Sequence, residues 1–153
     1  MSSLLEHSLD SKEFAMNLPS SITDNVAELL VKIIEFTEAR HKALIRNIQN
    51  FHSADFIPQD LAVEEFCTLL NDAIDAHSRS QCLVFCDTKN IKFGAAGAFE
   101  AHPMLDKHSK HLLDQDQHEY LQSQMNKLLE NSLNQRIAAE LLVQKEGKVS
   151  ILD

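Results

Sequence analysis

The sequence contains very few of the residues that make turns: among its 153 residues there are three glycines and three prolines, and tryptophan is missing. Sheet-rich folds depend on glycine and proline at their many turns, so this scarcity disfavours them. Leu, Ala, Glu, Gln and Lys, which favour helix, are abundant. The composition therefore predicts one mainly helical domain.

Long apolar runs and clusters of basic residues are also missing. No apolar run approaches the roughly 20 residues of a membrane-spanning helix, and the formal net charge of −9 disfavours nucleic acid and anionic membranes as partners. The N-terminal sequence "MSSLLEHSLDSKEFAMNLPS" lacks the basic start and continuous apolar segment of a cleaved signal peptide. The ordinary expectation is a cytoplasmic protein, unless export uses a route that reads no cleaved signal.

Cysteine is scarce as well, and Cys67, Cys82 and Cys86 make an odd count. Cys82 and Cys86 are four residues apart, which in an extended strand is a separation of roughly 13 Å, too far for a disulfide. We expect free and partly buried thiols.

The strongest pattern is a long amphipathic segment that follows a polar N-terminal extension of residues 1–20. The sequence "NLPSSITD" predicts a break around Pro19, with good N-cap residues behind it. The following run predicts a helix of roughly 26–28 residues. Its apolar stripe weakens in the middle, at Thr37 and at Arg40 or His41.

A shorter helix is predicted in "QDLAVEEFCTLLNDAIDA", behind Pro58, and it completes an N-terminal region of residues 21–76. Residues 77–111 contain a short β-like run and two glycines, and they predict a hairpin or an irregular arm. A second long helix is predicted in residues 112–153, with acidic residues at its start and Gly147 as its C-terminal cap.

These elements predict a mainly α fold. The long N- and C-terminal helices are similar in length and amphipathic, so we expect them to pair along their apolar stripes as an antiparallel, coiled-coil-like hairpin. A short helix and an irregular or small β segment would lie between them, and the whole would be one assembly domain.

No constellation in the sequence predicts an enzyme. Four histidines lie close together in the middle of the chain: His102, His108, His111 and His118. His108 and His111 would share a helix face and, with a carboxylate, form a metal site, but no His-Glu-x-x-His or Cys-x-x-Cys motif accompanies them. The glycines of "KFGAAGAF" lack the Lys-Ser/Thr of a phosphate-binding loop. We expect no cofactor and no metal, with a His-rich metal-binding protein as the less favoured alternative.

Asn47 and Asn50 lie three residues apart at the end of the first long helix and allow two interpretations. Asparagine tolerates the left-handed conformation, so Asn50 or its neighbour could simply help the helix to stop. Alternatively, both amides would form hydrogen bonds with a neighbouring chain at a packed helix end.

This helix end and its continuation resemble a known family. The run "LIRNIQN" (44–50) corresponds to an A-x-N-I-A-N segment, "SADF" (53–56) to a T-P-G-Y loop, and Asn131 with "AAELL" (138–142) to the C-terminal helix. Together they are similar to the proximal-rod proteins of the bacterial flagellar basal body, of the FlgB type. In this chain the Pro-Gly pair of the loop is replaced by Ala54-Asp55, so the family's turn cannot be assumed.

The resemblance implies a structural subunit that is exported without a cleaved signal peptide and self-assembles through its terminal helices in the periplasmic rod of the flagellum. Its implied partners are other rod proteins and the export gate at the base of the rod, with no nucleic acid and no membrane span. A cytoplasmic helical adaptor or chaperone that uses the same coiled-coil surfaces is the alternative. The residues that we expect at assembly contacts are Leu30, Ile33, Leu44, Asn47, Ile48, Asn50, Phe56, Leu121, Met125, Leu128, Asn131, Leu133, Ile137, Leu141 and Leu142.

Overall fold

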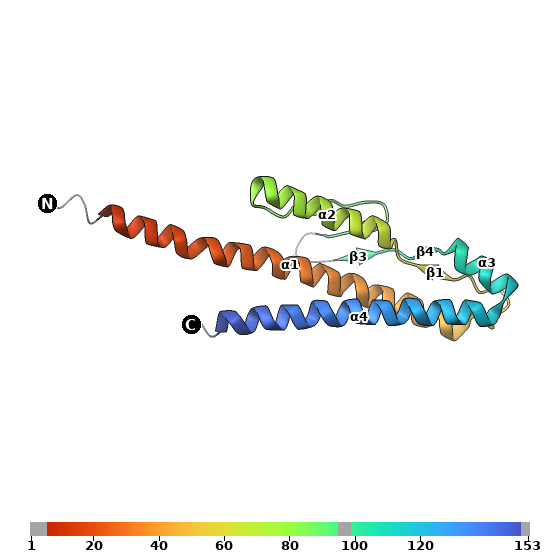
Figure 1. The fold of residues 1–153 in the computed structure, drawn as a ribbon. Helices are drawn as coiled ribbons and strands as arrows, with labels where there is room; N and C mark the ends of the chain where they lie inside the picture. The colour runs from red at the N-terminus through yellow and green to blue at the C-terminus, as the bar shows by residue number, and fades with distance from the viewer. Residues whose placement is uncertain (1–5, 95–98, 151–153) are drawn as a thin grey trace.

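The computed structural model describes the backbone of residues 6–94 and 99–150, and it shows a mainly helical chain with two small antiparallel sheets (Figure 1). The four helices are α1 (Glu6–Asn50), α2 (Val63–Ser80), α3 (Lys107–Gln115) and α4 (Gln117–Ser150). The strands have two residues each: β1 (Gln59–Asp60), β2 (Ile91–Lys92), β3 (Glu100–Ala101) and β4 (Met104–Leu105).

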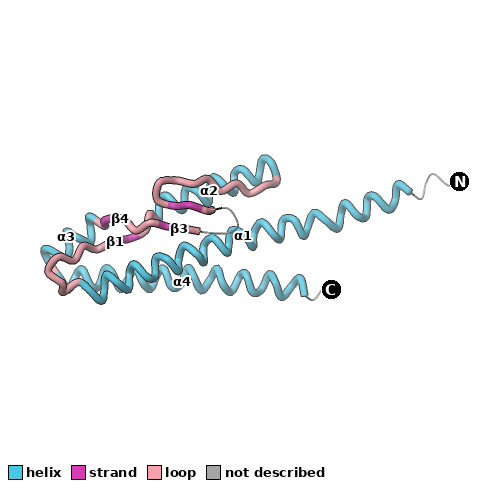
Figure 2. Tube along the Cα trace, turned by 180° about the vertical axis from the view of Figure 1, so that it is seen from behind, coloured by secondary structure: helices cyan, strands magenta, loops and turns pink. Residues whose placement is uncertain are grey.

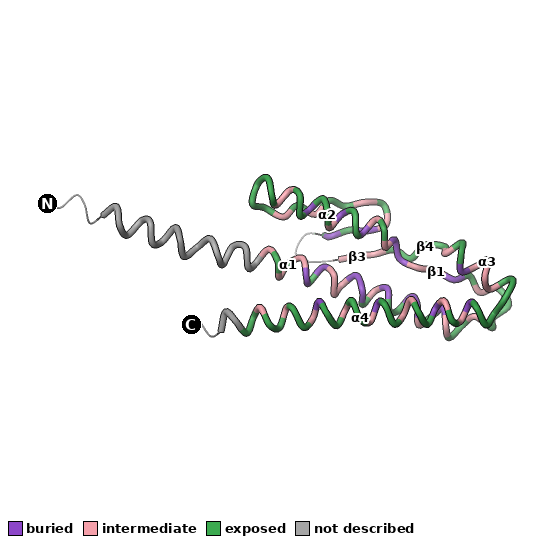
Figure 3. Tube along the Cα trace, viewed as in Figure 1, coloured by how far each residue is buried: buried purple, intermediate pink, exposed green. Residues whose placement is uncertain are grey.

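The two terminal helices form the predicted hairpin. α4 lies along α1 in the opposite direction, and α2 with the short strands covers another side of α1 (Figures 1 and 2). The prediction of a mainly α fold with paired terminal helices is therefore confirmed at this level. Figure 3 shows that buried residues concentrate on the inner sides of α1 and α2, while much of α4 is exposed.

The boundaries of the long helices differ from the sequence prediction at three points. α1 begins at Glu6 and continues through Pro19, where a break was expected; a proline removes one helical hydrogen bond but need not end a long helix. The C-terminal region is two helices, because Asp116 is extended and its carboxylate accepts hydrogen bonds from the backbone N–H groups of His118 and Glu119. Gly147 lies inside α4 and does not cap it.

The loop after α1 makes its turn without glycine. The N–H of Ser53 donates to the carbonyl of Asn50, and the N–H of Phe56 donates to that of Ser53, at 3.0 and 3.1 Å. Among the described residues, Gln81 at the C-terminus of α2 is the one non-glycine residue with positive φ. The "SADF" loop therefore needs no left-handed residue, and the loss of Pro-Gly is accommodated.

The hydrophobic core lies between α1, α2 and the β2–β3 hairpin. The rings of Phe36 and Phe66 stack with centroids 4.0 Å apart, and Phe99 meets the edge of Phe66. Phe93 packs between Phe85 and Phe99. This aromatic cluster attaches the middle segment to α1, so the predicted hairpin in residues 77–111 is present and is part of the core.

The carboxylate of Glu65 on α2 holds the loop that leads into β2. It accepts hydrogen bonds from the side chains of Asn90 and Thr88. These bonds hold the pKa of Glu65 below its usual value, and the bond from Asn90 has the larger effect. The three cysteines are free, as expected, but all three are exposed, so the expectation that they are partly buried is wrong.

Candidate assembly interface

The side of α4 that faces α1 is unusually polar. Its buried residues are Tyr120, Gln124, Asn131 and Ala138, and their spacing of four, seven and seven residues is that of a coiled-coil seam. Three of these four side chains carry hydrogen-bonding groups. The helices pair as predicted, and Leu121, Leu128 and Leu142 of the expected apolar stripe are half-buried, but most of the fully buried positions of α4 are polar.

Asn131 joins the two helices near the middle of the seam. Its side-chain amide donates to the backbone carbonyl of Thr37 at 2.8 Å, and the residue is 1% exposed. The hydroxyl of Thr37 is directed to its own helix, where it donates to the carbonyls of Ile33 and Ile34. Thr37, which interrupts the apolar stripe of α1, is thus the residue whose carbonyl accepts the hydrogen bond from Asn131 of α4.

Asn47 connects three parts of the chain at the closed end of the hairpin. Its amide donates to the carbonyl of Gln59 at 2.8 Å and to the side chain of Gln124 at 2.9 Å, and its side-chain oxygen accepts from the N–H of Gln59 at 3.1 Å. The hydroxyl of Tyr120 donates to the backbone carbonyl of Asn47 at 3.0 Å. Asn47 therefore fixes α1, β1 and α4 relative to one another within one chain.

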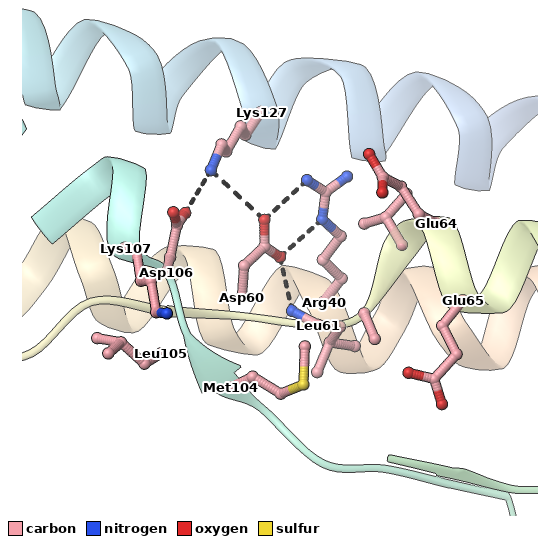
Figure 4. Close-up of a pocket in the computed structure, with 12 residues that line it drawn as sticks. Arg40, Asp60, Leu61, Glu64, Glu65, Met104, Leu105, Asp106, Lys107 and Lys127 are labelled. Carbon is pink, nitrogen blue, oxygen red and sulfur yellow. Dashed lines mark hydrogen bonds and ion pairs between the residues drawn. The ribbon is translucent and has the colours of Figure 1, made fainter. Parts of the chain in front are cut away.

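A cluster of charged side chains lies beside this network (Figure 4). Arg40 on α1 forms a bidentate pair with the carboxylate of Asp60 on β1, with both N···O distances at 2.9 Å. Lys127 on α4 lies 2.5 Å from Asp106 and 3.6 Å from Asp60. Two cations and two carboxylates from four segments thus neutralise one another in a half-buried site.

Asp106 is also the N-cap of α3. Its carboxylate accepts from the N–H of Ser109 at 3.0 Å and from the hydroxyl of Ser109 at 2.6 Å, while Gln124 donates to that hydroxyl oxygen at 2.8 Å. Burial alone would raise the pKa of Asp106, but the hydrogen bonds from Lys127 and Ser109 outweigh it and lower the pKa below its usual value. Burial, with the nearby charge of Asp106, raises the pKa of Tyr120 to about 12.

The charged cluster lines an open cleft of about 620 Å³ between α1, the start of α2 and β4. The carboxylates of Asp60 and Asp106 are held by cations and backbone N–H groups of the same chain. Arg40, Asp60, Asp106 and Lys127, which we name the latch, therefore connect four segments of the chain. Within the described residues, no three His, Cys, Asp or Glu side chains are grouped so as to hold a metal ion.

The outer side of α4 carries an exposed apolar stripe. Its members recur every fourth residue and are each about half exposed: Met125 (61%), Leu129 (61%), Leu133 (51%), Ile137 (55%) and Leu141 (47%). Burying a Leu, Ile or Met side chain releases roughly 1.5–3 kcal/mol, so a row of five exposed on one helix is a candidate contact surface.

A narrow apolar groove of about 310 Å³ runs between α1, α2 and α4. Ile33 of α1, Leu70 of α2 and Ile137 and Leu141 of α4 are among its lining residues. Ile137 and Leu141 therefore belong both to the stripe and to the lining of the groove.

The predicted assembly residues fall into two groups. Those buried or half-buried in the folded chain are Leu30, Ile33, Leu44, Asn47, Ile48, Phe56, Leu121, Leu128, Asn131 and Leu142. Those exposed are Asn50, Met125, Leu133, Ile137 and Leu141. Asn50 does not join the network of Asn47, since its amide donates to the carbonyl of Arg46 in its own helix at 3.0 Å.

Sequence patterns did not indicate five residues of the site, which are Arg40, Asp60, Asp106, Tyr120 and Lys127. Asp60 was expected in the first turn of the short helix, whereas it lies in β1 and pairs with Arg40. Two signals were present: the polar interruption of the stripe at Arg40, and the Asp-x-x-Ser spacing of an N-cap at Asp106.

The fold and site define a helical hairpin with a polar latch and an exposed apolar stripe. Comparisons with protein-family models, curated proteins and solved structures found no match to this chain. Among the described residues, no helix combines the length and apolar character that crossing a membrane requires.

Proposed function

We propose that the chain is a structural subunit that assembles through its paired terminal helices, as the resemblance to flagellar proximal-rod proteins implies. The observation that supports this most directly is the exposed stripe on α4, the helix whose opposite side is already occupied by α1. A helix with one face paired and the other apolar is suited to contacts between subunits.

In this proposal the polar contacts between the helices and the exposed apolar stripe on α4 have different roles. Asn47, Asn131 and the cluster of Arg40 with Asp60 hold the hairpin in one register within each subunit. The stripe on α4 then contacts neighbouring subunits. The assembly would belong to the periplasmic rod at the base of the flagellum, reached by export without a cleaved signal, with other rod proteins and the export gate as partners.

The test replaces one residue of the stripe in a motile bacterium that carries this chain as its only copy. Leu133→Asp is the most informative change, because Leu133 is 51% exposed and the substitution leaves the seam intact. We expect loss of motility and of the subunit from isolated basal bodies, while the purified variant keeps its helical circular dichroism. Leu128→Asp and Leu142→Asp should also abolish assembly, although both positions are half-buried and the hairpin itself would be weakened.

Two controls accompany this change. Asn126→Asp places the same charge on an exposed polar position of α4, and His108→Ala with His111→Ala alters two exposed histidines; both should preserve motility. Full motility of the Leu133 and Leu128 variants would refute the rod proposal. A folded protein that stays in the cytoplasm of a cell with an intact flagellar export gate would favour the adaptor alternative.

A further inference from the structure

A small concavity of about 310 Å³ lies between α1, the loop that follows it and the residues around β3. Successive residues of an α-helix are rotated by roughly 100°. Lys42 and Arg46, which line the concavity, are therefore turned by roughly 140° and 180° from Thr37, the residue that bonds to α4. The concavity thus lies largely on the side of α1 away from α4, and its lining residues differ from those of the apolar groove.

The walls of this concavity are largely apolar. Ala39 and Ala43 lie one turn apart on α1, where their small side chains leave the space open. Phe56 and Ile57 of the loop also line it, and Ile57 is 53% exposed. Phe56 is one of the residues expected at assembly contacts. The volume of the concavity is at the lower end of the roughly 300–1,000 Å³ of ligand pockets, so the space suits one large side chain and its neighbours.

The concavity also carries unpaired positive charge. Among the described residues that line it, the charged ones are Lys42 and Arg46. Both are exposed, and in the described part of the chain neither side chain forms a hydrogen bond or an ion pair. They differ in this from Arg40 and Lys127 of the latch, which are held by carboxylates. Lys42 and Arg46 therefore keep their hydrogen-bond donors for a group outside the chain.

The carboxylates closest in sequence leave these two cations unpaired. Glu35 pairs with Lys32 at 3.0 Å. Glu38 and Asp55 are exposed, but neither of them lines the concavity or forms an ion pair within the described residues. The lining therefore has two positive charges although the net charge of the chain is −9.

The charges and the walls together define what the concavity can bind. Phosphate or another small anion would meet the cations but would leave the apolar walls in water. Nucleic acid and anionic membranes reward many clustered cations, and the net charge of −9 opposes both. A carboxylate next to an apolar side chain fits both features, because the carboxylate pairs with the cations and the side chain covers the walls.

We infer that the concavity binds an acidic segment of a partner protein, in which an aromatic side chain is flanked by carboxylates. The ring lies against Phe56 and Ile57, within reach of the cations, while the carboxylates pair with Lys42 and Arg46. This surface is separate from the stripe on α4, so it adds a second contact to the proposed function and does not depend on the rod assignment.

The test uses two matched peptides and the ¹⁵N-labelled full chain. The probe is acetyl-Glu-Phe-Glu-amide, and its uncharged counterpart is acetyl-Gln-Phe-Gln-amide; each is titrated while the backbone amide signals are followed by NMR. The acidic peptide should shift the signals of residues 39–47 and of Ile57 saturably, with a Kd on the order of 1 mM. The uncharged peptide should bind about fivefold more weakly, since exposed ion pairs are individually modest.

Variants of the lining should separate the effect of charge from that of the apolar wall. Lys42→Gln with Arg46→Gln should reduce the affinity for the acidic peptide to that for the uncharged one, and Ile57→Ala should weaken both. All three positions are exposed, so the helical circular dichroism should not change. Lys89→Gln with Lys107→Gln removes two charges at exposed lysines outside the concavity and should leave the Kd unchanged.

Three results would overturn the inference: equal affinity for the two peptides, saturable shifts confined to other parts of the chain, or no saturation by about 10 mM peptide. Inorganic phosphate that shifts the same signals with the affinity of the acidic peptide would show an unspecific small-anion site and would overturn it as well.

The peptide titration and the test in cells fail independently. The stripe variant Leu133→Asp should bind the acidic peptide with the Kd of the unaltered chain, because Leu133 lies outside the concavity. Unaffected motility of that variant would refute the rod proposal and leave the peptide result unchanged. Failure of the acidic peptide to bind would refute the concavity as a contact and leave the rod proposal standing.

Discussion

Asn131 on α4 donates a hydrogen bond of 2.8 Å to the backbone carbonyl of Thr37 on α1, across a seam where both residues are at most 5% exposed. A buried amide at a seam position stabilises one register of two helices, because any shift along the helix axis would leave it without a partner. The hairpin therefore has a fixed register although much of its seam is polar.

Replacing Asn131 with Ala should lower the free energy of unfolding by about 1–3 kcal/mol, the cost of losing a buried hydrogen bond and leaving a small cavity. Asn126→Ala, on the exposed side of the same helix, should change it by less than about 0.5 kcal/mol. Urea denaturation followed by circular dichroism at 222 nm measures both. Equal stability of the two variants would show that the Asn131 bond does not hold the seam.

Replacing Asn47 or Asn50 with alanine should lower the stability of the fold by very different amounts. Asn47 is 1% exposed and forms three hydrogen bonds to β1 and α4, so Asn47→Ala should destabilise the fold by about 2–4 kcal/mol. Asn50 is exposed and bonds only within its own helix end, so Asn50→Ala should cost less than about 0.5 kcal/mol. Thermal unfolding of the pair at one protein concentration distinguishes them, and a large loss for Asn50 would contradict this assignment.

The sequence was sufficient to predict the hairpin, because long amphipathic periodicity and scarce glycine and proline leave few alternatives to paired helices. It drew attention to Asn47 and Asn131 through the family resemblance, but as contacts with a neighbouring chain, whereas in the structure both form hydrogen bonds within one chain. It did not show that Met125, Leu133 and Ile137 would lie outside the seam, since periodicity defines an apolar arc but not which part of it faces the partner helix.

The latch of Arg40, Asp60, Asp106 and Lys127 could not be predicted for a different reason. Its members come from four segments that are far apart in the sequence, and only the two-residue pairing of β1 with β4 brings Asp60 and Asp106 to the same edge. Strands of two residues leave almost no periodic signal. A local pattern such as Asp-x-x-Ser predicts the cap at Asp106, but not the lysine that reaches it from α4.

Asp106 should make the stability of the fold depend on pH. Its pKa is lower in the folded chain than the ordinary value of 3.8, so the stability it contributes is present above pH 3.8 and is lost as pH falls through the lower folded value. In Asp106→Asn, which keeps the shape of the cap, the free energy of unfolding should therefore fall less steeply between pH 5 and pH 2 than in the unaltered chain. Exposed Asp114→Asn provides the matched control, and identical pH profiles for Asp106→Asn and the unaltered chain would refute this role.

Tyr120 allows the closed end of the hairpin to be followed directly, because it is the only tyrosine and the chain has no tryptophan. Its hydroxyl is fully buried and donates to the carbonyl of Asn47, and its pKa is raised to about 12 from 10.0. The protonated phenol thus stabilises the fold below pH 10, and this contribution is lost as pH rises from 10 toward 12. Absorbance at 295 nm should show no phenolate in the folded chain at pH 10.5, while the same chain in 8 M urea should be mostly ionised. In the Asn47→Ala variant Tyr120 should ionise at lower pH than in the unaltered chain, because loss of the bonds from Asn47 to Gln59 and Gln124 loosens the packing that buries the phenol. Ionisation near pH 10 in the unaltered folded chain would mean that Tyr120 is not enclosed by the hairpin.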